Sequence, residues 1–451
     1  MFKQKAKVLT SLILIMMFLM SFTVINTAAQ ARTQEEEAIA KAVEYLKKMQ
    51  NPDGGFSNRK GLPSSTSLTN WVIMALKAAG EDVNSSKWKK NGNSPLDFIY
   101  TNISQFESTN DISRTLLSLT ASGRGVNFKG DDLAEKIISF QQPNGQFCQP
   151  AKGEKELINT HMWAVIALSS AGKDIPHKEK AGEWLLYRQN KDGGFGWAVG
   201  AESDPDDTGI AIITLVLLGD NPENSKAIQK AVKYLKNWQE DNGGIGWNLY
   251  KANAATDAWA IQGLLAAEEN ISGSEWKVNG NTPLSHLLSL QKSDGSFKWM
   301  EDRESSPALM TAYAIMALAK KPFPVNLNFN NLKTNSLKIS LTINENTSIV
   351  NGRKKLLDVP PTIINNRTMV PLRFISENLG AEIQWKEEIQ TVEIMLKDKK
   401  LSLTIGKIAP GLDTPATIVN GRTLVPIRYV SENLGAKVTW LAKERRVEIE
   451  K

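Results

Sequence analysis

The sequence predicts a mainly α-helical protein, an (α/α)6 toroid of six helix pairs followed by a small α+β domain with an internal duplication. Two observations lead to this prediction. A glutamine–glycine–aromatic turn recurs along the first two thirds of the chain, between an amphipathic segment and a more uniformly apolar one. The last third contains a second, unrelated repeat. Supersecondary units repeated at a fixed period stack on one continuous core.

The repeated turn separates an outer helix from an inner one. Its copies are QNPDGGF from Gln50, QQPNGQF from Gln141, QNKDGGF from Gln189, QEDNGGI from Gln239 and QKSDGSF from Gln291. Glycine ends the preceding helix because it tolerates the left-handed backbone that a chain reversal requires. The amphipathic segment before each turn predicts an outer helix, and the apolar segment after it predicts a buried inner helix.

The later turns follow one another at about 50 residues, whereas the first interval is about twice as long. A worn copy fills that interval, with an outer helix over 94–104 and an inner helix over 108–123. Six pairs over 35–322 can therefore close into a barrel of inner helices inside a ring of outer ones. Over about 35–321 the chain resembles the prenyltransferase and squalene-cyclase repeat family, whose members are α/α toroids.

The N-terminus predicts export. A basic start precedes an apolar stretch over 8–25, and Ala29-Gln30-Ala31 fits a small-x-small cleavage site. These features predict a signal peptide over 1–31, with an uncleaved anchor as the alternative. Cys148 is the single cysteine, so no internal disulfide can form and stability must come from the packed core. We expect a secreted, cell-surface protein.

The remainder of the chain predicts a linker over 323–338 and a different domain over 339–451. About half of the positions are identical between the two copies that start at Thr362 and Thr417, each predicting a hairpin, a short helix and a strand. These copies resemble the copper amine oxidase N-terminal-like domain, a non-catalytic stalk module. The segment contains no His and no Cys, the residues that a copper site requires.

From 323 onward 19 residues are basic and 13 acidic, which favours an anionic cell-wall polymer as partner. We find no nucleic-acid-binding motif.

The most specific chemical candidate is Asp204-Pro205-Asp206-Asp207-Thr208. It is similar to the Asp-x-Asp-Asp-Thr motif of squalene-hopene-type cyclases, whose middle carboxyl protonates an alkene. The resemblance implies that Asp206 is the general acid and that Asp204 and Asp207 are its neighbours. The same residues also suit an ordinary helix start, with Asp204 as N-cap, Pro205 at the first helical position and acidic side chains at the positive end of the helix dipole.

Aromatic and polar side chains near the starts of the inner helices predict a shared mouth. In a cyclase the aromatic faces would stabilise a carbocation, and His161 would hydrogen-bond the acidic cluster. The candidate binding residues are Asn70, Trp71, His161, Trp163, Thr208, Asp257, Trp259 and Tyr313.

Two further chemistries are weaker candidates. A prenyltransferase-like zinc site needs an Asp, a Cys and a His, but Cys148 lies in a turn, and His177 and His286 fall on outer helices where we expect a solvated surface. A glycosidase or lyase would need facing carboxylates, for which the candidates are Asp111, Asp206, Asp207 and Asp257. No metal and no cofactor are expected.

Two functions remain open. The first is an exported toroid that binds a small molecule, isoprenoid or peptide in its mouth, with the C-terminal module associating with the cell wall. The alternative is a protonation-initiated isoprenoid cyclase with Asp206 as general acid. The two cyclase toroids implied by the resemblance count against the alternative, because this chain contains one.

Overall fold

The computed structural model describes residues 32–451 except 249, 328, 330–336, 352 and 397–398. The signal peptide predicted over 1–31 and the central part of the predicted linker therefore lie outside the described residues. In the described part of the chain, no helix combines the length and the apolarity that crossing a membrane requires.

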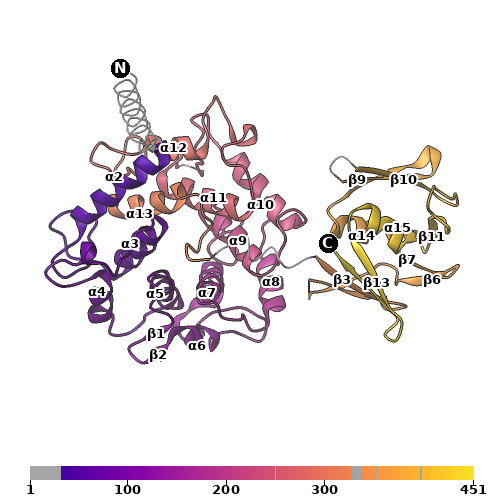
Figure 1. Cartoon of the computed structure of the whole chain (residues 1–451), viewed down its shortest axis with the longest axis horizontal. Helices are drawn as coiled ribbons and strands as arrows, with labels where there is room; N and C mark the ends of the chain where they lie inside the picture. Colours follow the sequence, from indigo (N-terminus) through magenta and orange to yellow (C-terminus); the bar gives the residue numbers. More distant parts are fainter. Residues whose placement is uncertain (1–31, 249, 328, 330–336, 352, 397–398) are drawn as a thin grey trace, which may run out of the picture.

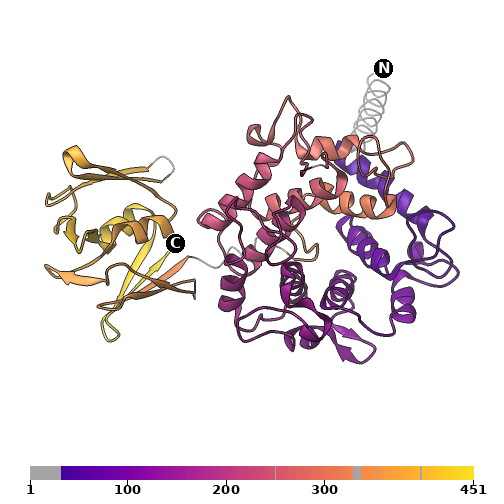
Figure 2. The ribbon, with the colours of Figure 1, turned by 180° about the vertical axis from the view of Figure 1, so that it is seen from behind.

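Twelve helices of the described chain form a closed toroid (Figures 1 and 2). Each inner helix packs against the next, and α13 packs against α3, so the ring closes as predicted. The inner helices are α3 (Thr66–Ala78), α5 (Thr109–Ala121), α7 (Ile158–Ser170), α9 (Pro205–Leu217), α11 (Ala254–Ala266) and α13 (Pro307–Leu318). The outer helices are α2 (Gln34–Met49), α4 (Pro95–Asn102), α6 (Leu133–Ile138), α8 (Lys178–Leu186), α10 (Lys226–Asn237) and α12 (Pro283–Ser289). The worn copy is therefore the pair α4 and α5.

The glutamine of each repeated turn ties one helix pair to the next. The side-chain amide of Gln189 donates to the carbonyl oxygens of Gly193 and Ala227, both at 2.8 Å. Gln50, Gln141 and Gln239 make the equivalent two bonds. Gln291 donates to Gly295 and to the Ala38 carbonyl at 2.8 Å, which joins the last turn to the first helix. This bond closes the ring.

The first glycine of the turn lets the next outer helix approach. Gly193 has φ of 92°, and a Cβ there would lie 2.7 Å from the Lys230 carbonyl oxygen of α10. Gly243 repeats this contact against the chain at Asn281, where a Cβ would lie only 2.6 Å from the carbonyl carbon. A side chain at either position would strain the backbone and displace the next helix.

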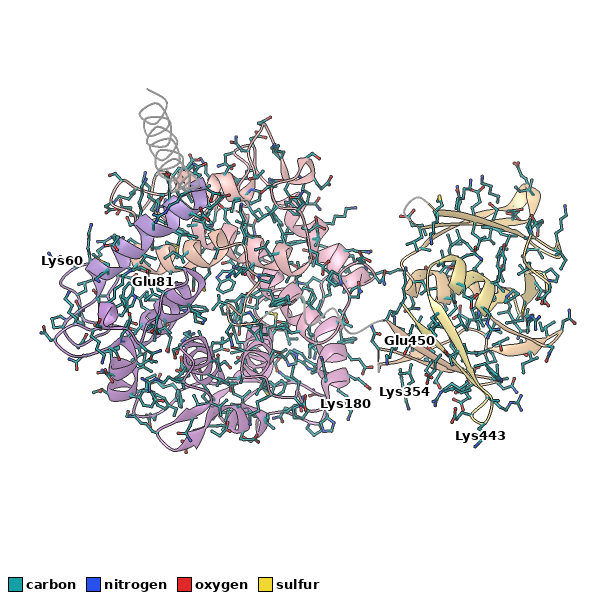
Figure 3. All side chains as sticks on the ribbon, in the orientation of Figure 1. Lys60, Glu81, Lys180, Lys354, Lys443 and Glu450 are labelled. Carbon is teal, nitrogen blue, oxygen red and sulfur yellow. The ribbon has the colours of Figure 1, made fainter. Side chains whose placement is uncertain are left out.

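Aromatic rings fill the axis of the toroid. Trp71, Trp163, Trp259 and Tyr313 form neighbouring pairs with ring centroids 5.2 to 5.6 Å apart. Phe323 is fully buried against the three tryptophans, at 5.6 to 6.4 Å. Phe323 therefore belongs to the toroid core, although the sequence places it at the start of the linker. By contrast, Lys60 and Lys180, labelled in Figure 3, extend from the outer surface.

The C-terminal domain consists of three antiparallel sheets and two short helices. Both sequence copies contain the predicted hairpin and helix, but each continues into a second hairpin where a single strand was expected. The first copy contains β6 (Thr362–Ile364), β7 (Arg367–Pro371), α14 (Leu372–Asn378), β8 (Glu382–Lys386) and β9 (Thr391–Leu396). The second contains β11 (Thr417–Val419), β12 (Arg422–Pro426), α15 (Ile427–Asn433), β13 (Lys437–Leu441) and β14 (Arg446–Glu450). The flanking strands are β3 (Lys338–Thr342), β4 (Thr347–Val350), β5 (Arg353–Leu356) and β10 (Lys399–Thr404).

The two copies meet at their first hairpins. Strand β12 pairs antiparallel with β7, so the central sheet runs β11-β12-β7-β6. The other two sheets run β10-β9-β8 and β13-β14-β3-β4-β5. The domain encloses its own apolar core, separate from that of the toroid.

We predict that Phe323→Ala destabilises the toroid by about 3 to 5 kcal/mol, because it removes a fully buried ring and leaves a cavity below the tryptophans. Denaturant unfolding followed by tryptophan fluorescence measures the change. Tyr187→Ala is the matched control, since that ring is 84% exposed and its loss should change stability little. Equal stability of the Phe323→Ala variant and the parent chain would place Phe323 outside the core.

Candidate functional site

The acidic motif begins helix α9, and Asp204 is its N-cap. The Asp204 Oδ1 atom accepts the backbone N–H of Asp207 at 2.8 Å, and Pro205 occupies the first helical position. The capping role expected from the sequence is therefore present. It accounts for Asp204, whereas Asp206 contributes no cap bond.

Asp206 lines a pocket of about 210 Å³. Its carboxyl is only partly accessible, and three aromatic side chains contribute to the pocket walls. The lining residues are Asp204, Pro205, Asp206, Trp247, Tyr250, Asn253, Ala255, Thr256 and Trp299. The acid thus lines a partly open pocket that also contains three aromatic rings.

The aromatic walls come from the loops that follow two of the repeated turns. Trp247 stacks on Tyr250 with ring centroids 6.4 Å apart, and Tyr250 lies 6.1 Å from Trp299. The Trp299 indole Nε1–H donates to Asn253 Oδ1 at 3.0 Å, which fixes the ring. These residues were not predicted from the sequence, because the candidate aromatics all came from the starts of inner helices. The Gly-Trp pair after the Gln239 turn was the available signal.

Burial keeps protons on the acidic cluster. It raises the pKa of Asp206 to about 7, and the nearby Asp204 carboxyl adds to this while a hydrogen bond with Thr256 opposes it. Burial raises the pKa of Asp204 as well. It also raises the pKa of Asp207 far above the ordinary range, with Asp204 as the next cause. Near neutral pH, the group that faces the pocket can therefore hold a proton and release it.

A second buried pair lies beside the cluster. Asp257 accepts the Ile245 N–H through Oδ1 at 2.7 Å, and its Oδ2 lies 2.6 Å from His286 Nδ1. Burial raises the pKa of Asp257. Burial alone would lower the pKa of His286, but the hydrogen bond and charge of Asp257 outweigh it and raise that pKa. His286 is 3% exposed, so the expected solvated position was wrong.

The predicted contact between His161 and the acidic cluster was also wrong. His161 Nδ1 accepts the backbone N–H of Phe147 at 3.0 Å, so the ring is held against its own turn and not against the acids. Burial lowers the pKa of His161 to about 3, so the ring is neutral. The histidine beside the acids is instead His286, which comes from an outer helix.

The positions of His161, Thr208 and Asp257 form one structural series. Each accepts the N–H of the apolar residue that ends a repeated turn, as Thr69 and Thr311 do. This bond attaches the turn to its inner helix. Thr208 and His161 are fully buried and therefore do not line a mouth.

Asn70 likewise lies between helices. Its amide donates to Thr115 Oγ1 at 3.3 Å and accepts from Ser118 Oγ at 2.6 Å, which joins α3 to α5. Asn70 is 2% exposed, so its predicted place at the mouth was wrong. The four predicted axial aromatics do come together, and Trp163 and Tyr313 remain half-buried.

The candidate residues of the two weaker chemistries differ in how the fold places them. Cys148 is buried in its turn, and Asp111 pairs with Arg114 at 3.0 Å. In the described ranges, no group of three or more His, Cys, Asp or Glu side chains is placed to hold a metal ion. Asp206, Asp207 and Asp257 do lie near one another. As a result, the charge of Asp257 raises the pKa of Asp206, and the charge of Asp206 raises the pKa of Asp207.

Comparisons with known proteins agree with both domains. A family model described as the prenyltransferase alpha-alpha toroid domain matches residues 5–245 and 211–337, and one described as the copper amine oxidase N-terminal domain matches 330–394 and 379–449. The chain is similar to drimenyl diphosphate synthase of Streptantibioticus cattleyicolor, 25% identical over 266 residues, which are 55% of this chain and 41% of the relative. The corresponding synthase of Streptomyces showdoensis is 32% identical over 144 residues, 31% of this chain and 26% of the relative.

The chain therefore spans less than half the length of these two curated relatives. Among solved structures, it is similar to the type II terpene cyclase MstE from Scytonema in complex with geranylgeranyl dihydroxybenzoate. That comparison has 14% identity and a TM-score of 0.47, and it covers 64% of this chain and 97% of the other.

We predict that Asp206→Asn stabilises the fold above neutral pH. The folded-state pKa of about 7 exceeds the ordinary value of 3.8, so the stability of the parent chain is complete below about pH 4 and declines as pH rises through 7. The amide cannot ionise and avoids this loss, which is on the order of 2 kcal/mol because solvent in the pocket screens part of the full cost. The gain in Tm should grow from pH 4 to 7 and then level off.

Thermal unfolding at several pH values measures this gain, with the exposed Asp174→Asn variant as control. A difference in Tm that stays constant with pH would mean that the Asp206 carboxyl is solvated.

We predict that His286→Phe costs about 3 to 5 kcal/mol, because it leaves Asp257 buried without its partner. The double variant Asp257→Thr/His286→Tyr should recover most of that loss. It recreates the preceding repeat, where Thr208 holds the turn and Tyr234 covers the second glycine as His286 does here. Denaturant midpoints compare the three proteins. A double variant less stable than the single one would contradict the equivalence of the two repeats.

Proposed function

We propose that this chain, which belongs to the prenyltransferase α/α-toroid family, is a type II isoprenoid cyclase in which Asp206 is the general acid. One observation carries the proposal. The Asp206 carboxyl has a pKa of about 7 and faces a pocket walled by Trp247, Tyr250 and Trp299. A helix cap explains Asp204 but explains neither the burial of Asp206 nor the aromatic walls.

The chemistry follows from that geometry. The protonated Asp206 gives its proton to the terminal carbon–carbon double bond of a linear isoprenoid, and a tertiary carbocation forms at the neighbouring carbon. The π electrons of the next double bond attack this cation and close a ring. The last cation loses a proton to water or to a base, so the product is an isomer of the substrate. Water then returns a proton to the Asp206 carboxylate.

The aromatic side chains of the pocket can stabilise the carbocation. Indole and phenol faces attract a cation within about 6 Å of the ring, and the attraction strengthens where water is excluded. At about 210 Å³ the pocket is smaller than the 300 to 1,000 Å³ typical of sites that enclose a whole ligand. It would hold the reacting end of the isoprenoid, with the remainder of the chain outside it.

The second buried pair supports the acid from outside the pocket. Thr256 hydrogen-bonds Asp206 and precedes Asp257, whose partner is His286. We assign Asp257 and His286 as positioning residues, because they hold the start of α11 beside the acid. The Asp257–His286 pair also places a proton-sharing group next to the cluster.

The relatives favour this proposal over the ligand- or peptide-binding toroid, because two drimenyl diphosphate synthases are similar to the chain. A linear isoprenoid with a diphosphate head is therefore the first substrate to test.

Export and association with the cell surface remain proposals that rest on the N-terminal sequence. The C-terminal domain, with its excess of basic residues, would supply the surface association.

We predict that the full chain cyclises a linear prenyl diphosphate and that Asp206→Asn lowers turnover about a hundredfold or more, the usual contribution of a general acid. Activity of the parent chain should fall about tenfold per pH unit above pH 7, because only the protonated carboxyl can react. Product analysis by mass spectrometry after incubation with farnesyl and geranylgeranyl diphosphate measures both.

The control is Asp174→Asn, an exposed acid away from the pocket, which should retain full activity. Equal turnover by Asp206→Asn would remove the general acid from the proposal. If the parent chain cyclised no prenyl diphosphate, prenyl alcohol or squalene, the cyclase function itself would be wrong.

A further inference from the structure

The C-terminal domain contains a groove of about 730 Å³. Both sequence copies build it, with the turn of the β6–β7 hairpin from the first and helix α15 and strands β13 and β14 from the second. The loop at 410–413 forms the remaining wall. A groove that needs both copies is a consequence of the duplication, because neither copy alone would enclose it.

Trp440 presents an aromatic surface in this groove. It lies on β13, an edge strand, and is 38% exposed although most large apolar side chains of the domain are buried. Tyr429 lines the same groove, and its hydroxyl donates to the Pro410 carbonyl at 3.2 Å. That bond holds the phenol ring in place and leaves the hydroxyl oxygen able to accept a further bond.

Charged side chains line the same groove as these two rings. Arg367 Nε donates to both carboxylate oxygens of Asp413, at 2.8 and 3.0 Å, and its Nη1 donates to the Asn366 carbonyl at 3.3 Å. Arg428 pairs with Glu432 at 3.6 Å. The groove therefore contains two cationic and two anionic side chains. Because these charges pair with one another, the groove offers hydrogen-bond donors and acceptors and no net charge.

Exposed aromatic rings flanked by fixed donors and acceptors suit one class of ligand. A pyranose ring has an apolar C–H face that packs on an indole ring, and hydroxyl groups around its edge that both donate and accept hydrogen bonds. We propose that this groove binds a carbohydrate chain, with one sugar ring on Trp440 and neighbouring hydroxyls on the Arg367–Asp413 pair.

Binding of a sugar in the groove differs from electrostatic attraction of a polymer to the whole domain. The domain as a whole is basic, with 19 basic and 13 acidic residues from 323 onward, and would attract any anionic polymer weakly. Binding in the groove rests on stacking and hydrogen bonds, so it should resist salt, whereas the general attraction should be screened.

The duplication supplies a matched control. Trp385 occupies the position in the first copy that Trp440 occupies in the second, it is 41% exposed, and it does not line this groove. Trp440→Ala and Trp385→Ala therefore remove the same side chain from equivalent strands of the two copies. A difference in sugar binding between them isolates the groove.

The test titrates the full chain with soluble β-linked hexasaccharides of glucose and of N-acetylglucosamine, followed by calorimetry and tryptophan fluorescence. We expect one of them to bind, Trp440→Ala to weaken binding at least tenfold, and Trp385→Ala to change it less than twofold. Raising NaCl from 50 to 500 mM should change the affinity less than twofold.

Three results would overturn the proposal. The first is binding of neither hexasaccharide, and the second is equal binding by Trp440→Ala and the parent chain. The third is self-association of the parent chain in sedimentation that Trp440→Ala abolishes, which would make the groove an interface between copies. None of these outcomes bears on cyclase activity, so the two proposals fail independently.

Discussion

The side-chain amide of one glutamine in each turn holds the toroid together. It satisfies a carbonyl within its own turn and another in or shortly before the next outer helix, so five of the six pairs are tied to their successors. The bond from Gln291 to Ala38 joins residues 253 apart in the sequence and, together with the packing of α13 on α2 and α3, closes the ring. Closure fixes where the starts of the inner helices lie, and with them the acidic residues of the candidate site.

The candidate site lies where the repeat departs from its own pattern. In three repeats a threonine hydroxyl accepts the N–H at the end of the turn. In the repeat after the acidic motif, the Asp257 carboxylate accepts that N–H instead, and it pairs with His286. His286 covers the second glycine of this turn, where Tyr234 does so in the preceding repeat. The loops after two turns carry Trp247 and Trp299 over the same region. Burying several carboxyls together costs stability, and a regular repeat provides the rigid surroundings that can bear it. Such local costs are typical of functional sites.

The sequence was sufficient to predict the fold because its signals are local and repeated. The turns, the six pairs including the worn copy, the ring and the duplicated second domain all follow from spacing and periodicity. The site was predicted in part. Asp204, Asp206 and Asp207 were found as a motif, but the partner of Asp257 was not, because His286 lies on an outer helix whose inward face the pattern does not distinguish. The roles of Asn70 and His161 depend on which neighbour each meets, and spacing alone does not determine that.

The central claim is that the Asp206 carboxyl transfers a proton to carbon. Incubation of the full chain with farnesyl diphosphate in deuterium oxide tests it directly, because the acid exchanges its proton with solvent before each turnover. We predict a cyclised product that carries one deuterium in the ring methylene group derived from the CH carbon of the terminal double bond. A cyclised product without deuterium at that position would contradict it.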